Sequence, residues 1–100
     1  MLAAKVDANQ TAIVDALREA GAKVIILSSV GRGCPDLLVY YGGKTYSYDG
    51  YKLYLLDCKA EGGRRTPKQK RVWQDWPVIE VHNEMEALRA IGAVVQDSEI

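Results

Sequence analysis

Apolar residues recur at helical spacing near the start of the chain. Positions i, i+3, i+4 and i+7 share one face of an α-helix, and here they hold Ile13, Ala16, Leu17 and Ala20. Asp7 is a suitable cap before this pattern, and Gly21 is a natural stop after it. The pattern predicts a helix over residues 8–20. The side chain of Asn9 lies on the same face, where it either points into a site or is satisfied by backbone at the helix start.

Four short segments have the composition of β-strands. They are rich in apolar and β-branched residues and too short for a core helix, and they cover residues 23–29, 36–41, 52–60 and 78–82. The turn signals Gly42-Gly43 and Asp49-Gly50 separate the second segment from the third. We therefore expect these two strands to form a hairpin with a long tip.

Two further helices are indicated by their capping residues. A cap, a proline at the first helical position and a glutamine at the third are supplied by Thr66, Pro67 and Gln69. This helix ends before Pro77, and Asn83 caps a third helix that Gly92 terminates. The predicted order is α-β-β-β-α-β-α, an α/β sandwich with a small mixed β-sheet. Residues 1–100 are expected to form one domain.

The composition is that of a globular protein. Of the 100 residues, 48% are apolar and 26% are charged, which excludes a disordered chain. No apolar run approaches the ~20 residues that span a bilayer, and the first ten residues do not resemble a signal peptide. Two cysteines and one histidine cannot supply a disulfide framework or a four-ligand zinc site. We expect a cytoplasmic protein with no membrane partner and no organic cofactor.

The charges are unevenly distributed, although the net charge is zero. From Lys59 to Arg71 there are six basic residues and one acidic residue, whereas the rest of the chain carries 7 basic and 12 acidic residues. A concentrated basic block favours a polyanionic partner such as nucleic acid. The alternative is a solvated loop and helix face.

Acidic and basic side chains are placed together by the predicted strands. Alternate side chains of a strand share a face, so Asp57 and Lys59 point the same way. Hairpin pairing brings the strand that holds Asp36 beside them, so two carboxylates come within reach of one ion. Mg²⁺ takes hard oxygen ligands, and the backbone carbonyl of Cys58 offers a third. The alternative is a surface ion pair between Asp57 and Lys59.

Three sequence blocks resemble the PD-(D/E)xK nuclease superfamily, and within it the minimal VRR-NUC domains of phages and bacteria. The blocks are Gly31-Arg32-Gly33-Cys34-Pro35-Asp36-Leu37-Leu38-Val39, Leu56-Asp57-Cys58-Lys59 and Thr66-Pro67-Lys68-Gln69. The resemblance implies a restriction-endonuclease-like fold. It also implies a divalent-metal DNA endonuclease, a hydrolase whose stand-alone members form homodimers and resolve four-way (Holliday) junctions.

The resemblance also implies roles for individual residues. Asp36 and Asp57 become metal ligands for Mg²⁺ or Mn²⁺, together with the Cys58 carbonyl. Lys59 becomes the catalytic lysine, and Gln69 the motif glutamine that projects into the site. The family often has an acid where Asn9 stands, and Asn9 can coordinate a metal through its amide oxygen. His82 and the indoles of the two tryptophans are interpreted as packing or surface residues.

The DNA is expected to bind through the basic residues of the loop and helix. These are Arg32, Arg64, Arg65, Lys68, Lys70 and Arg71. Such contacts follow the phosphate backbone and give salt-dependent affinity with little base recognition. The expected partners are branched or duplex DNA and a second copy of the chain, in a bacterial cell or a phage-infected host.

Two alternatives to an endonuclease remain open at this point. The first is a non-catalytic nucleic-acid-binding module on the same fold. The second is an interaction domain that binds protein through the hairpin, because this region holds the six tyrosines Tyr40, Tyr41, Tyr46, Tyr48, Tyr51 and Tyr54.

Overall fold

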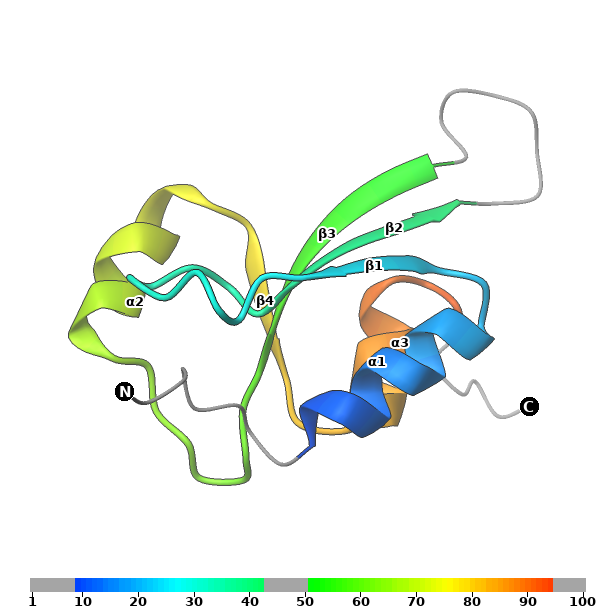
Figure 1. The fold of residues 1–100 in the computed structure, drawn as a ribbon, viewed down its shortest axis with the longest axis horizontal. Helices are drawn as coiled ribbons and strands as arrows, with labels where there is room; N and C mark the ends of the chain where they lie inside the picture. Colours follow the sequence, from blue (N-terminus) through cyan, green and yellow to red (C-terminus); the bar gives the residue numbers. More distant parts are fainter. Residues whose placement is uncertain (1–8, 43–50, 95–100) are drawn as a thin grey trace, which may run out of the picture.

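A computed structural model describes residues 9–42 and 51–94. The helices are α1 (Gln10–Glu19), α2 (Pro67–Val72) and α3 (Glu84–Ala90), with a 3-10 turn, η2 (Trp73–Asp75), directly after α2. The strands are β1 (Lys23–Ile26), β2 (Leu37–Gly42), β3 (Tyr51–Cys58) and β4 (Val78–Val81). The predicted α/β order of elements is therefore confirmed (Figure 1).

The four strands form one mixed sheet in the order β1-β2-β3-β4. β1, β2 and β3 are antiparallel neighbours, with Leu37 paired to Leu56, whereas β4 runs parallel to β3. A parallel pair needs a crossover connection, and the segment that contains α2 and η2 provides it. This connection starts where β3 ends, so the basic segment lies next to the end of β3 that carries Asp57.

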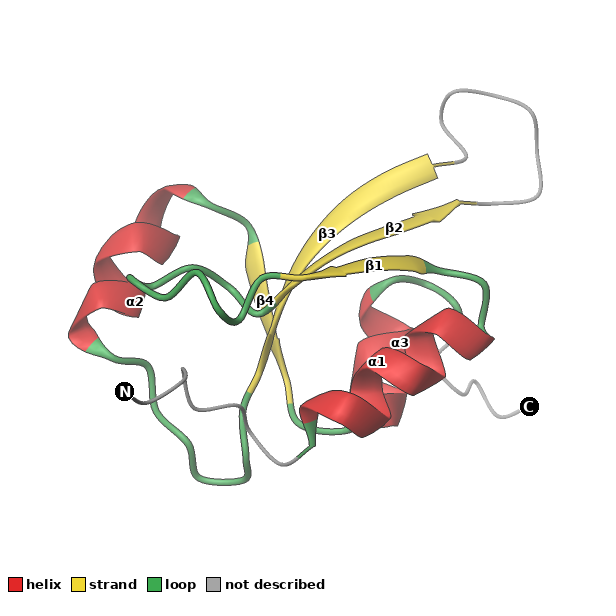
Figure 2. Ribbon diagram, in the orientation of Figure 1, coloured by secondary structure: helices red, strands yellow, loops and turns green. Residues whose placement is uncertain are grey.

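Two helices cover one face of the sheet (Figure 2). α1 and α3 pack against each other and against the sheet, and this layer contains the hydrophobic core. The core residues include Ile13, Leu17, Leu37, Val39, Leu56, Cys58, Val81, Ala87 and Ile91. Burial of these side chains supplies the main stabilisation of the fold, at roughly 25 cal/mol per Å² of apolar surface.

Helix α1 begins later than the sequence predicts and buries a different stripe. Asn9 occupies the N-cap position, and Asp7 lies outside the described residues. The buried positions are Gln10, Ile13, Val14 and Leu17, while the predicted Ala20 is exposed. Because α1 packs on α3 as well as on the sheet, its buried face is rotated toward Gln10 and Val14.

The strand ends also differ from the prediction. β1 stops at Ile26, because residues 27–36 form a looped segment that Leu27 and Asp36 close with an N–H···O bond of 2.6 Å. β3 stops at Cys58, because the chain turns at Ala60, whose carbonyl accepts from Gly63. The tip of the hairpin, residues 43–50, lies outside the described residues.

Among residues 9–42 and 51–94, none of the helices has the length and apolar character to cross a bilayer.

Candidate active site

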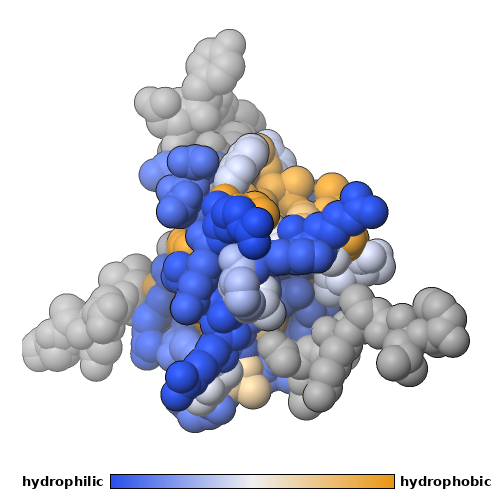
Figure 3. Space-filling view, turned by 90° about the vertical axis from the view of Figure 1, so that its left-hand side faces the viewer, coloured by the Kyte–Doolittle hydropathy of each residue, from blue (hydrophilic) through white to orange (hydrophobic). Residues whose placement is uncertain are grey.

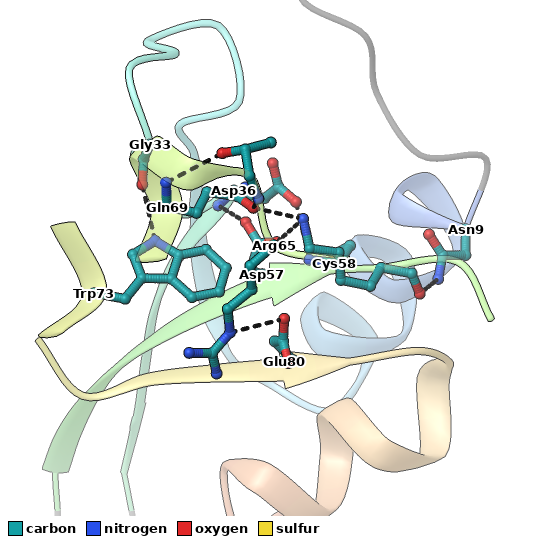
Figure 4. Close-up of polar contacts among 11 residues, drawn as sticks. Asn9, Gly33, Asp36, Asp57, Cys58, Arg65, Gln69, Trp73 and Glu80 are labelled. Carbon is teal, nitrogen blue, oxygen red and sulfur yellow. Dashed lines mark hydrogen bonds and ion pairs between the residues drawn. The ribbon is translucent and has the colours of Figure 1, made fainter. Parts of the chain in front are cut away.

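Asp36 and Asp57 interlock across β2 and β3 (Figure 4). The Asp36 N–H donates to Oδ1 of Asp57 at 3.2 Å, and the Cys58 N–H donates to Oδ2 of Asp36 at 2.9 Å. The Asp57 carboxylate is thus held by the residue just before β2, and the Asp36 carboxylate is held by Cys58 of β3. The structure brings together the two acids that the hairpin pairing predicts to meet.

The environment of Asp57 disfavours its charged form. Asp57 is only 1% exposed. Burial is the largest cause of a pKa raised to about 6, the negative charge of Asp36 adds to it, and Lys59 opposes it. A buried carboxylate beside a second negative charge favours either a bound proton or a bound cation.

The ammonium group of Lys59 lies against three side chains. Nζ donates to Oε1 of Gln69 at 2.8 Å and forms an ion pair with Oδ2 of Asp57 at 3.3 Å. It also lies 5.7 Å from the ring centroid of Trp73, within cation–π range. Lys59 is 9% exposed, so these contacts hold a largely buried charge in one place.

Gln69 has two roles at once. Its Oε1 accepts from the Thr66 N–H at 2.9 Å, and its own N–H donates to Oγ1 of Thr66 at 3.1 Å. These bonds complete the predicted capping box at the start of α2. Because the same Oε1 accepts from Lys59, the start of α2 directly positions the lysine.

Trp73 belongs to the site, which the sequence interpretation missed. It is 5% exposed, and its Nε1 donates to the carbonyl of Gly33 at 2.8 Å. The guanidinium of Arg65 lies 4.9 Å from the ring centroid. Trp73 therefore joins the loop before β2 to η2 and lies within cation–π range of two cations. Its spacing of four residues from Gln69, which places both on one helix face, was the available signal.

The side-chain amide of Asn9, a predicted metal ligand, is hydrogen-bonded to the protein backbone. Its Nδ2 donates to the carbonyls of Lys59 at 3.1 Å and of His82 at 2.7 Å. Its Oδ1 is buried and has no hydrogen-bond partner among the described residues. Asn9 thus links the start of α1 to the chain just beyond β3 and β4.

Gln10 is a second polar side chain that the sequence interpretation missed. It is 4% exposed, and its Nε2 donates to Oγ of Ser28 at 3.1 Å. Ser28 in turn lines the same hollow as Asp36. Adjacency to Asn9 was the only sequence signal, because glutamine on a helix is usually solvated.

A hollow of about 580 Å³ opens beside the carboxylates. Asp36 and Gln69 line it together with three of the predicted DNA-binding residues, Arg32, Lys68 and Arg71. Hydrophilic side chains gather over this end of the molecule (Figure 3).

The other predicted DNA-binding residues lie elsewhere. Arg65 is paired with Glu80, its Nε lying 3.2 Å from Oε2. Arg64 and Lys70 are exposed and do not line the hollow.

The donor set fits a hard divalent cation with few protein ligands. Within residues 9–42 and 51–94 no group of three or more His, Cys, Asp or Glu side chains could hold a metal. Mg²⁺ is usually bound by only one or two carboxylates plus water and substrate oxygens, which Asp36 and Asp57 match. In a strand the N–H and C=O of one residue point to the same side, so the Cys58 carbonyl lies on the side of Asp36.

Similarity to known proteins adds nothing to this picture. Comparison of the chain with protein-family models, with curated proteins and with solved structures found no match.

Proposed function

We propose that this protein is a divalent-metal-dependent, structure-selective DNA endonuclease of the VRR-NUC type, on a restriction-endonuclease-like fold. One observation carries the proposal. The buried Asp57 and the half-buried Asp36 are joined by two hydrogen bonds between their carboxylates and the facing backbone, Asp57 pairs with Lys59, and Asp36 lines a basic hollow. This combination suits hydrolysis of a phosphodiester, a substrate that is anionic and gains charge in the transition state.

Each residue of the site has a chemical role in this proposal. Asp36, Asp57 and the Cys58 carbonyl hold Mg²⁺ or Mn²⁺. A bound ion of this kind polarises a phosphoryl oxygen and lowers the pKa of water. Lys59 neutralises charge that develops on the phosphate, and Gln69 keeps its ammonium group oriented.

The three basic residues of the hollow bind the DNA backbone. Arg32, Lys68 and Arg71 surround the space next to Asp36, so a phosphate held there lies beside the carboxylates. Contacts of this kind position DNA without reading its sequence. The selectivity of the enzyme therefore comes from the shape of the DNA.

A homodimer completes the proposal. A four-way junction is resolved by two symmetry-related cuts, and a two-fold dimer presents two sites with that symmetry. The sheet face opposite α1 and α3 exposes Ile25 (58%), Tyr40 (41%) and Leu53 (67%). Tyr40 is the register partner of Leu53, and Ile25 pairs with Leu38, two residues before Tyr40, so the three side chains share one face, which we call the sheet patch. A second copy of the chain is its occupant.

Cutting of a labelled four-way junction tests the proposal. Wild-type protein with Mg²⁺ is expected to release paired products, and EDTA is expected to stop the reaction. Asp57→Asn keeps the shape of the side chain but lowers the rate at least about 100-fold. Asp15→Asn, an exposed change on α1, is the matched control and retains the wild-type rate. Equal activity of Asp57→Asn and wild type would refute the proposal.

One observation favours a second candidate, a non-catalytic DNA-binding module. The amide nitrogen of Asn9 is bonded to two backbone carbonyls, and a third acidic ligand is missing from the described residues. This candidate predicts salt-dependent binding of the junction with no cutting at any Mg²⁺ or Mn²⁺ concentration. The same gel separates the two candidates.

A further inference from the structure

A second hollow adjoins the first and has a different character. Its volume is about 360 Å³. Its apolar lining residues are Leu27, Val30, Pro35, Leu55, Val72 and Trp76. The two hollows share the segment Gly31, Arg32 and Cys34 as a common wall. An apolar space therefore lies directly beside the basic space that contains Asp36.

Trp76 is presented to solvent by a fixed backbone. Its side chain is 59% exposed, whereas Trp73 is 5% exposed. The Trp76 N–H donates to the carbonyl of Trp73 at 3.3 Å, and its own carbonyl accepts from Val78 at 2.8 Å. An exposed indole on an ordered turn next to an apolar hollow offers a flat surface for stacking.

Arg32 stands where the hollows meet and holds an unusual backbone conformation. Its φ is 58°, in the left-handed region, between Gly31 at 70° and Gly33 at 84°. A Cβ on Gly33 would lie 2.9 Å from the carbonyl oxygen of Lys68, so the segment packs closely on α2. Arg32 lines both hollows and a third, smaller one with Lys68 and Arg71. Strained backbone of this kind concentrates at binding sites.

We propose that the second hollow is a subsite for one unpaired nucleobase, which stacks on Trp76 while the neighbouring phosphate occupies the basic hollow. This inference rests on the proposed function, because it presumes that DNA occupies the first hollow. The distribution of charge around the second hollow indicates which ligand it binds. An apolar floor with a cationic rim at Arg32 matches a base attached to a phosphate.

The subsite defines the class of substrate. A base inside a duplex stays stacked on its neighbours and cannot enter the hollow without unpairing. The preferred DNA therefore has an unpaired or easily opened nucleotide next to the cut, as at a branch point or a single-stranded flap. The subsite is lined by the loop after β1, by Leu55 of β3 and by Val72 and Trp76 at the two ends of η2, so it adjoins the sheet patch at β3.

Binding measured without cutting tests the subsite. Wild-type protein in EDTA is titrated with a single-stranded oligothymidine and with a perfectly paired duplex of equal length. Trp76→Ala is expected to weaken single-strand affinity about 5- to 100-fold, the usual effect of losing one base–aromatic stack. Duplex affinity is expected to change less than about 2-fold, because phosphate contacts alone hold it. Trp76→Phe keeps a stacking ring and retains most of the affinity.

Fluorescence assigns the effect to one indole. Single-strand DNA is expected to quench wild-type tryptophan emission and to leave Trp76→Phe unchanged, because Trp73 is buried. Met85→Ala, which removes another exposed apolar side chain on α3, is the matched control and binds like wild type.

Two outcomes would overturn the inference. One is an equal loss, or no loss, of single-strand and duplex affinity in Trp76→Ala. The other is emission that depends on protein concentration and not on DNA, which would show that a second copy covers the hollow. These binding assays contain EDTA and no metal. A failure to cut junctions in the separate cutting assay would therefore count against the proposed function and not against the subsite.

Discussion

At Asp57, burial and the negative charge of Asp36 both raise the pKa of the carboxyl group. The buried carboxyl has a pKa raised to about 6, above its usual value of 3.8. In the folded protein the proton is therefore held more tightly than in the unfolded chain. The stability that the folded protein gains by binding this proton is fully present below about pH 4 and is lost as the pH rises through 6.

This linkage makes a prediction for Asp57→Asn, which cannot titrate. Without metal, the variant is expected to be more stable than wild type at pH 7.5, by at most about 3 kcal/mol for a shift of about two pKa units. At pH 4 the two proteins are expected to have the same stability, because wild-type Asp57 is then neutral. Urea unfolding in EDTA at both pH values measures the difference. A gain independent of pH would show that Asp57 does not titrate near 6.

In the proposed metal site, the same carboxyl is expected to couple metal affinity to pH. Divalent cations compete with the proton on Asp57, so binding of Mg²⁺ is expected to strengthen between pH 5 and 7 and then to level off. The rise in melting temperature on adding Mg²⁺ measures this, since a ligand of the folded state stabilises it. Asp57→Asn should lose the rise at every pH. A constant Mg²⁺ effect from pH 5 to 7 would contradict the assignment of Asp57 as a ligand.

The residues of the site differ in how far the sequence predicts them. Strand geometry places Asp57 and Lys59 on one face and brings Asp36 beside them, so these positions could be predicted from the sequence. The roles of Trp73, Gln10 and Asn9 depend on contacts over 40, 18 and 50 or more residues of sequence. No local pattern encodes such contacts, because they arise only when α1, the loop before β2 and α2 converge.

At the scale of elements, the start of α2 joins helix stability to the position of Lys59. Gln69→Ala removes the capping contact to Thr66 and the acceptor for the lysine. Thr66→Ala removes only the cap, so it serves as the matched variant. Both are expected to lose about 1 kcal/mol of stability. Only Gln69→Ala is expected to lower the cutting rate, by about 10-fold, and to shift its pH profile. Equal rates in the two variants would mean that Gln69 acts only as a cap.

Asn9 connects the start of α1 to the ends of β3 and β4. A substitution at this position tests its predicted role as a metal ligand. Asn9→Asp would place a carboxylate against the carbonyls of Lys59 and His82, which cannot donate. We expect a loss of about 1 to 3 kcal/mol of stability and no gain in Mg²⁺ affinity. Thermal unfolding with and without Mg²⁺ measures both. Tighter Mg²⁺ binding by Asn9→Asp would instead support a ligand role.

Element boundaries were predicted less well than element types. The capping residues Thr66 and Asn83 located α2 and α3, because capping is a local interaction. The ends of β1 and β3 were placed too late, because strands stop where the chain must leave the sheet. At β1 that departure forms the segment containing Arg32, which lines both hollows. The least predictable part of the chain is thus the part that shapes the proposed substrate site.

For the whole molecule, the distribution of charge matters more than its total. The net charge is zero, yet Arg32, Lys68 and Arg71 share one hollow. Each phosphate contact contributes a slope of about −0.9 to the logarithm of affinity against the logarithm of salt concentration. Lys68→Gln is therefore expected to reduce the slope for duplex DNA by about 1, whereas Arg89→Gln, at an exposed position on α3, leaves it unchanged. Gel shifts over a salt series measure both slopes.

The sheet patch gives the last prediction. Across a two-fold interface, a lysine at position 53 would face either the same lysine of the second copy or an apolar side chain of the patch. Leu53→Lys is therefore expected to weaken self-association at least about 10-fold. Met85→Lys places the same charge on α3, away from the patch, and should leave the dimer intact. Sedimentation over a concentration series measures both. The monomeric variant keeps its site, so it should nick one strand of a junction without the paired cut. A wild-type protein that is monomeric and still makes paired cuts would remove the need for a dimer.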